Sequence, residues 1–349
     1  MKHIPALDSL RYLMAVLIVV HHIFVNFYMA EGRLGVLLGT YLAVDGFFVI
    51  SGVLLMNSYV HLVRRQADLP PLEGLRLFTV SRLRRLYPEF LFVLVLTAAV
   101  RLLLRQSAPW SFLLPDLFML GNFCGVESMV RDAWFISSLF WMSLLLFALT
   151  LFFRKPFCVV AVPAIMLLCY LFILNVPRSL SLNSAPMFFG MISGSVPRTL
   201  FGLCAGMITF MLMPALDRLS NAAAALGEAA CLCYAVWLVA FGSPEQRCDF
   251  VPVFCVIIAV LCRRREWFLR FLSWKGFDRV NASSYMLFLC HLLIVENAAV
   301  FFRSELMRWN PVFVFLLLIL LSLMAALVLS RLCRMTGAAL VRLRPLLLR

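Results

Sequence analysis

Charged residues are scarce in this sequence. They make up 14% of its 349 residues, while apolar types make up 64% and the mean hydropathy is +0.98. A soluble domain usually has roughly 25% charged and 45–50% apolar residues. Because the apolar excess extends along the whole chain, the composition excludes a soluble enzyme held by a single anchor.

Signatures of several other classes are missing as well. There is no glycine-rich phosphate loop, so ATP-driven transport lacks its usual signature. The eleven cysteines include no CxxC pair and no His/Cys zinc spacing. We interpret them as small packing residues and expect no metal. Two of them, Cys124 and Cys248, fall in expected outer loops and could pair with each other.

The apolar stretches predict an all-α fold: a polytopic membrane helix bundle of about ten transmembrane helices, since each span needs roughly 20 mostly apolar residues. The short stretch 110–122, broken by Pro115, is expected to be interfacial or re-entrant. Residues 1–335 would form one transmembrane domain, and residues 336–349 a short basic cytoplasmic tail. The expected spans are 7–29, 36–58, 88–105, 133–153, 157–175, 196–214, 223–241, 250–263, 282–303 and 310–333.

The net charge of +14 is explained by membrane topology. With ten spans and the N-terminus inside, 21 of the 31 Lys and Arg residues fall on the cytoplasmic side and nine on the other. This asymmetry follows the positive-inside rule and predicts that both termini are cytoplasmic. The first segment carries Arg11, His21 and His22 and no cleavage site, so we expect a span there and not a cleaved signal peptide. Nucleic-acid binding is not needed to explain the basic residues.

Ionisable side chains inside spans cost about 2.5–3.5 kcal/mol each on insertion scales, so their default interpretation is functional. Those that we single out are Asp8, Arg11, His21, His22, Asp45, His291 and Glu296.

Arg11 and His22 are eleven positions apart, roughly 1100° around a helix, which places both on one face about 16 Å apart along the axis. Asp8 lies one turn before Arg11 and can pair with it. A neutral imidazole at His22 could take a proton from a hydroxyl as that hydroxyl attacks an acyl carbon. The alternative is that His22 caps a buried carbonyl and that Arg11 reaches the membrane surface.

Asp45 lies in the second expected span, next to Gly46 and ahead of Ser51 and Gly52. It is either a catalytic carboxylate or the structural partner of an Arg or His in a tight helix-packing motif.

Arg82 and Arg85 are neighbours on a helical turn and are followed by Tyr87 and by Pro88 at the expected start of the third span. Guanidinium groups bind phosphate well. A simple anchor at the inner membrane surface is the alternative.

Taken together, these residues resemble the acyltransferase-3 family of bacterial membrane O-acyltransferases. Arg11 and His22 match the family's Arg and His separated by ten residues in the first span. The other motifs follow in the family's order: Asp45 with Phe47 to Gly52, including Ser51; Arg82, Arg85, Tyr87 and Pro88; Trp134 to Ser137; Arg198 with Gly202 and Gly206; and Ser283 to His291, including Tyr285.

Two positions depart from the family pattern. Many members carry two glutamates shortly after the Trp-Ser element, where this chain has Leu139, Phe140 and Trp141. Phe288 stands where members have a second tyrosine before the late histidine.

The resemblance implies an O-acyltransferase that moves an acyl group, usually acetyl, from cytoplasmic acyl-CoA to a hydroxyl of a cell-surface or lipid-linked carbohydrate such as O-antigen. Acetyl-CoA would be a donor substrate and not a permanently bound cofactor, and the protein would lie in the bacterial inner membrane. The implied catalytic residues are His22, Arg11 and Asp45, and the implied acyl-CoA ligands are Arg82, Arg85 and Arg11. Implied substrate-binding or structural positions are Ser51, Trp134, Ser137, Arg198, Tyr285 and His291.

The alternative function is a proton-coupled transporter of a small molecule or glycan precursor, since intramembrane Arg, His and Asp also suit proton coupling. A carrier would be expected to show an internal repeat, and none is visible. A non-catalytic scaffold for polysaccharide assembly is the third hypothesis.

Overall fold

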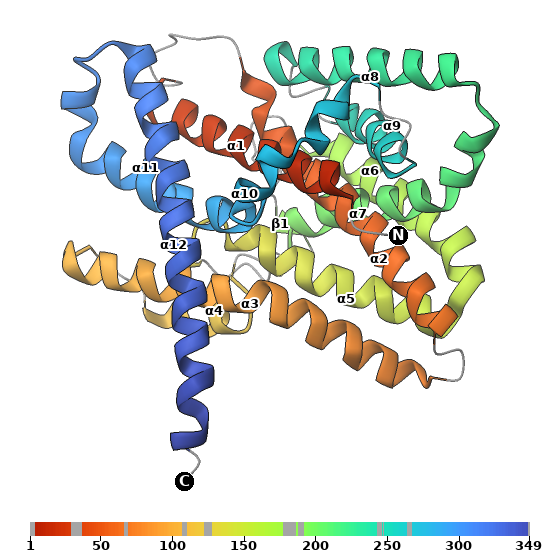
Figure 1. Ribbon diagram of the computed structural model, residues 1–349, viewed down its shortest axis with the longest axis horizontal. Helices are drawn as coiled ribbons and strands as arrows, with labels where there is room; N and C mark the ends of the chain where they lie inside the picture. Colours follow the sequence, from red (N-terminus) through yellow and green to blue (C-terminus); the bar gives the residue numbers. More distant parts are fainter. Residues whose placement is uncertain are drawn as a thin grey trace.

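The computed structural model describes residues 4–28, 37–65, 69–106, 110–121, 128–176, 186–187, 192–242, 246, 248–263 and 267–347. Within these ranges the protein is almost entirely helical (Figure 1). Its strands there are β1 (Pro186–Met187) and β2 (Ile192–Ser193), which pair antiparallel. The helices are α1 (Pro5–Phe27), α2 (Ala43–Arg65), α3 (Pro71–Leu103), α4 (Leu113–Leu117), α5 (Ala133–Pro156), α6 (Val162–Asn175), α7 (Ser195–Leu212), α8 (Asn221–Phe241), α9 (Phe250–Cys262), α10 (Asp278–Asn281), α11 (Ser284–Leu306) and α12 (Pro311–Leu347).

The predicted polytopic helix bundle is confirmed. In the described ranges, eight helical stretches are long and apolar enough to cross a membrane. One of them, Ala133–Asn175, contains both α5 and α6. The backbone is kinked at Arg154 near the end of α5, where φ is 50°, and the π-helical turn Phe157–Ala161 leads into α6. The shorter apolar helix α9 has 13 residues. These helices correspond to the ten expected spans.

The most buried spanning helix is α2, which packs against α7, with α1, α5 and α9 also in contact. The close approach of α2 and α7 depends on glycine. A Cβ at Gly52 would collide with the carbonyl oxygen of Leu203, and one at Gly206 with that of Val49. Small residues permit such close helix contacts in membranes, as the sequence motif predicted.

The helix that contains the third expected span starts well before that span. Helix α3 runs for 33 residues from Pro71, with Pro88 inside it, so Pro88 does not begin the helix. A proline removes one backbone donor from a helix, and packing compensates here: the buried ring of Phe78 stacks on Phe147 of α5 with centroids 3.8 Å apart. Arg82 and Arg85 therefore lie within a continuous helix.

Two peripheral segments complete the described structure. In the stretch expected to be interfacial or re-entrant, Pro115 lies within the five-residue helix α4, so this stretch adds no span. Helix α12 contacts α11 and extends beyond the rest of the bundle to the C-terminus (Figure 1). Residues 336–347 of the expected tail continue this helix. The suggested Cys124–Cys248 pair involves Cys124, which lies outside the described residues.

Candidate active site

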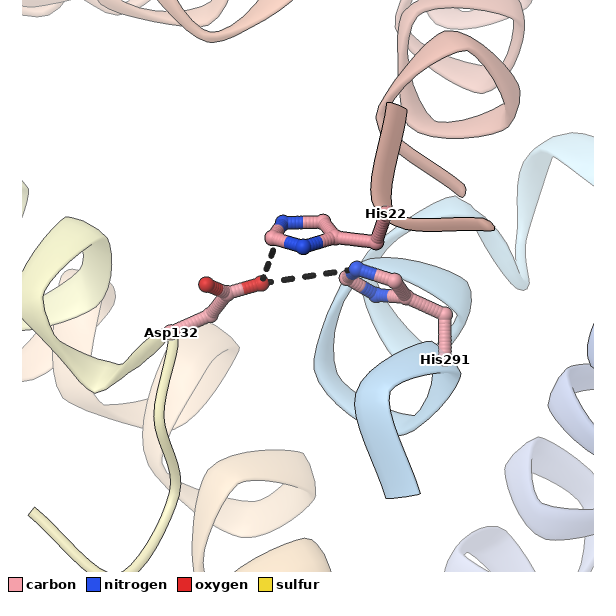
Figure 2. Close-up of side chains that lie close together, drawn as sticks. All are labelled: His22, Asp132 and His291. Atoms are coloured by element: carbon pink, nitrogen blue, oxygen red, sulfur yellow. Dashed lines mark ion pairs between the residues drawn. The ribbon is translucent and has the colours of Figure 1, made fainter. Parts of the chain in front are cut away.

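Three ionisable side chains from distant parts of the chain lie close together. They are His22 of α1, Asp132 at the start of α5 and His291 of α11 (Figure 2). Asp132 Oδ2 lies 3.7 Å from His22 Nε2 and 3.4 Å from His291 Nε2. The two imidazole rings have centroids 5.0 Å apart. His291 is fully buried and the side chain of Asp132 is 9% exposed, whereas that of His22 is 22% exposed. His22 is thus the member that a substrate can reach.

The hydrogen bonding of His291 determines what its second nitrogen carries. His291 Nδ1 lies 2.8 Å from the carbonyl oxygen of Phe288. A carbonyl only accepts, so Nδ1 donates, and in a neutral ring Nε2 then carries a lone pair. This lone pair would face Asp132 Oδ2, and neither atom has another hydrogen-bond partner among the described residues. A proton or a cation between them would satisfy both atoms, because two buried acceptors facing each other are strongly unfavourable.

Asp132 is well placed to hold such a proton. It is the residue immediately before α5, where the helix dipole favours a negative charge. Burial nevertheless raises the pKa of its carboxyl to about 6, because removal from water disfavours the charged form. Trp134 lies beside the same carboxyl group and partly opposes this rise in its pKa. At pH values near or below 6, Asp132 and His291 can therefore share one proton.

Asp132 was not among the residues that the sequence singled out. It lies outside the expected span 133–153, so the cost of an intramembrane charge did not identify it. One signal was present: an acidic residue two positions before Trp134 of the Trp-Ser element. Asp132 lies near His22 and His291 because α1 packs on α11. Spacing along the chain does not reveal this packing.

The three residues could also hold a metal ion. One ligand atom from each lies within 4.8 Å of the others. Two histidines and one carboxylate are a common ligand set for Zn²⁺ or Fe²⁺. The hydrogen bond that His291 Nδ1 donates to the backbone carbonyl of Phe288 would suit a metal ligand as well. The cluster can therefore share a proton or bind a divalent cation, and chelation distinguishes the two.

Asp45 is paired with a second predicted residue. Arg198 of α7 donates to both carboxylate oxygens of Asp45, at 2.7 and 2.8 Å, and both residues are buried. The Arg198 guanidinium also lies 5.7 Å from the ring centre of Trp134. This is the structural pairing with an arginine that the sequence left open as the alternative to catalysis. It brings α2 and α7 to Trp134, which lies beside Asp132.

The remaining predicted positions lie on helices α1, α2, α5 and α11. Ser51 of α2 and Ser137 of α5 are buried. Tyr285 of α11 donates to the carbonyl oxygen of Leu86 in α3 at 3.2 Å, which fixes the two helices at one level. His21, which the helical spacing turned away from His22, lies 3.4 Å from Thr40 Oγ1.

The three predicted phosphate ligands form a separate group on α1 and α3. Arg11 Nη1 donates to Asp8 Oδ1 at 3.0 Å, as predicted. Arg11, Arg82 and Arg85 are close enough to interact electrostatically with one another. Three guanidinium groups with one carboxylate leave an excess of positive charge, which suits an anion such as phosphate.

These features define a polytopic membrane protein with a largely buried His–Asp–His cluster and a separate arginine group on α1 and α3. A protein-family model with the description "Acyltransferase domain" matches residues 4–331 of this chain. The chain belongs to this acyltransferase family, and the resemblance derived from the motifs is confirmed.

Curated relatives agree with this assignment over part of the chain. Proteins named "Putative O-acetyltransferase" from Staphylococcus aureus strains COL, MSSA476 and MRSA252 are 32%, 31% and 31% identical over 107 residues. The aligned segment covers 31% of this chain and 16% of each relative's length. No solved structure matches the chain.

Proposed function

We propose that the protein is a membrane O-acyltransferase that moves an acetyl group from acetyl-CoA to a hydroxyl of a cell-surface or lipid-linked carbohydrate. The observation that carries this proposal is the His22–Asp132–His291 cluster, which provides a partly accessible imidazole beside a buried proton-holding pair. Family membership supports acyl transfer. The names of the partial relatives support an acetyl group and a hydroxyl acceptor.

In this reaction His22 acts as the general base. Its Nε2 faces Asp132, which leaves Nδ1 to take the proton of the acceptor hydroxyl. The hydroxyl oxygen attacks the thioester carbonyl, the new C–O bond forms and the C–S bond breaks. The proton on His22 then passes to the departing CoA thiolate, so the enzyme returns to its starting protonation state. Asp132 and His291 orient His22 and stabilise its positive charge, as a carboxylate does in other base-assisted acyl transfers.

The donor would bind at the arginine group. Arg11 lies about 16 Å from His22 along α1, so phosphates held by Arg11, Arg82 and Arg85 would direct the acyl end of the donor towards the cluster. With both termini in the cytoplasm of a bacterial inner membrane, the donor site would open to cytoplasmic acetyl-CoA.

Replacing Arg85 by alanine tests this donor site. We expect the apparent KM for acetyl-CoA to rise about tenfold, because a charge-assisted hydrogen bond contributes roughly 1.5–3 kcal/mol, while the KM for the acceptor stays unchanged. Arg84→Ala is the matched control, because Arg84 is the adjacent exposed arginine on another face of α3. Equal acetyl-CoA KM values for Arg85→Ala and wild type would contradict the phosphate role.

Chelation tests whether the cluster uses a proton or a metal. Because we assign a shared proton to Asp132 and His291, dialysis of the purified protein against EDTA is expected to leave the acetyl-transfer rate unchanged. The metal content is measured in parallel by mass spectrometry. Loss of activity on dialysis, with recovery on adding Zn²⁺, would instead assign a cation to the three residues.

A further inference from the structure

A pocket lies beside the cluster, on the side away from the arginine group. It is formed by the end of α3, residues 129–131 and α11. Val130 and Arg131 of its wall immediately precede Asp132, and Leu292 immediately follows His291. The pocket is therefore adjacent to the residues that hold the shared proton.

Two helices define the position of the pocket relative to the donor site. Tyr285 of α11 bonds to Leu86 of α3, next to Arg85. Eleven residues further along each helix, about 16 Å, Thr97 and Glu296 both line the pocket. His291 lies between these two levels on α11. The order along the bundle is arginine group, cluster, pocket, so donor and acceptor could approach the cluster from opposite ends.

The lining of the pocket combines donors, acceptors and apolar surface. Gln106 Nε2 donates to Asn297 Oδ1 at 3.2 Å, and Arg101 donates to the carbonyl oxygen of Met129 at 3.3 Å. Arg131 forms an ion pair with Glu296. The apolar part of the wall consists of Leu289, Leu292, Leu293 and Val300.

This combination matches one ligand chemistry. A hydroxyl both donates and accepts, as the amides of Gln106 and Asn297 do, while arginine only donates and glutamate only accepts. The leucine surface can cover the C–H face of a ring. The larger cavity between α6, α7 and α9 has a mainly apolar lining and contains no residue of α3, α11 or the Asp132 turn.

We propose that this pocket binds the acceptor as a single hydroxyl-bearing sugar ring, with Gln106 and Asn297 as its specificity-determining amides. This proposal rests on the proposed acetyl transfer and adds the position and chemical class of the acceptor subsite. The Arg131–Glu296 pair joins the residue before Asp132 to α11. It therefore both lines the subsite and holds Asp132 against His291.

The test measures donor and acceptor kinetics separately. The full-length protein is reconstituted in proteoliposomes with labelled acetyl-CoA, and the acceptor is deacetylated envelope glycan from a strain deleted for the gene. Asn297→Leu keeps the approximate size of the side chain but removes its hydrogen bonds. We expect the apparent KM for the glycan to rise at least tenfold, with the KM for acetyl-CoA unchanged.

Asn175→Leu is the matched control, because Asn175 donates to the carbonyl oxygen four residues earlier at 2.7 Å, just as Asn297 does at 2.6 Å. It lies outside the pocket lining and should behave as wild type. Gln106→Leu, at the end of α3, is the second variant if Asn297→Leu does not fold, and its glycan KM should also rise.

The outcomes separate the two proposals. Unchanged glycan KM values in a folded Asn297→Leu or Gln106→Leu protein, with normal transfer by wild type, would overturn the pocket assignment alone. A parallel rise in the KM for acetyl-CoA would indicate a general structural effect and would also overturn it. Absence of any acetyl transfer by wild type would overturn the proposed function, and the pocket assignment with it.

Discussion

His22→Ala is expected to lower acetyl transfer by about 10²–10⁴-fold, the range that a positioned general base contributes. The variant removes the imidazole that lies 3.7 Å from Asp132 and is the accessible member of the cluster. Because the side chain is partly exposed, its removal should leave the protein folded and inserted. The rate is measured with labelled acetyl-CoA in proteoliposomes, and folding by size-exclusion chromatography in detergent.

His21→Ala is the matched control for this prediction. His21 is the adjacent histidine of α1 but lies near Thr40 and Tyr41, away from Asp132. It should retain most of the wild-type rate. Near-normal transfer by a folded His22→Ala protein, or equal losses in both variants, would contradict the assignment of His22 as the base.

Arg198→Ala is expected to destabilise the fold by about 3–5 kcal/mol, because it leaves the carboxylate of Asp45 buried without its partner. Both side chains are under one-tenth exposed, so water cannot take over the lost hydrogen bonds. The free energy of unfolding is measured by denaturant titration of the purified protein in detergent micelles.

A double variant shows whether the pair acts as a unit. Replacing a buried ion pair by apolar residues is often neutral or stabilising, so Asp45→Leu with Arg198→Leu should recover much of the stability lost in Arg198→Ala. If Arg198→Ala unfolds like wild type, the pair does not stabilise the contact between α2 and α7. If the double variant is less stable than both wild type and Arg198→Ala, the two residues act independently.

The bundle was largely predictable because a membrane span leaves a strong signal, a long apolar segment. The start of α3 was not predictable. Local rules place proline at a helix start, whereas packing of Phe78 on Phe147 maintains the helix before Pro88. The 23-residue helix α1 and its Asp8–Arg11 pair follow directly from short-range spacing.

The site was only partly predictable. His22 and His291 could be found because ionisable groups in spans are costly. Asp132 lies just outside a span and carries no such signal. Asp45 and Arg198 are 153 residues apart, so the sequence could identify each residue but could not choose between catalysis and structural pairing for Asp45.

The most direct test of acetyl transfer follows the label itself. Proteoliposomes containing the wild-type protein are supplied with labelled acetyl-CoA and deacetylated envelope glycan, and the glycan is then analysed for alkali-labile acetyl esters. We predict labelled ester that requires both His22 and acetyl-CoA. Movement of unmodified glycan across the vesicle membrane, with no labelled ester formed, would contradict acetyl transfer and favour a transporter.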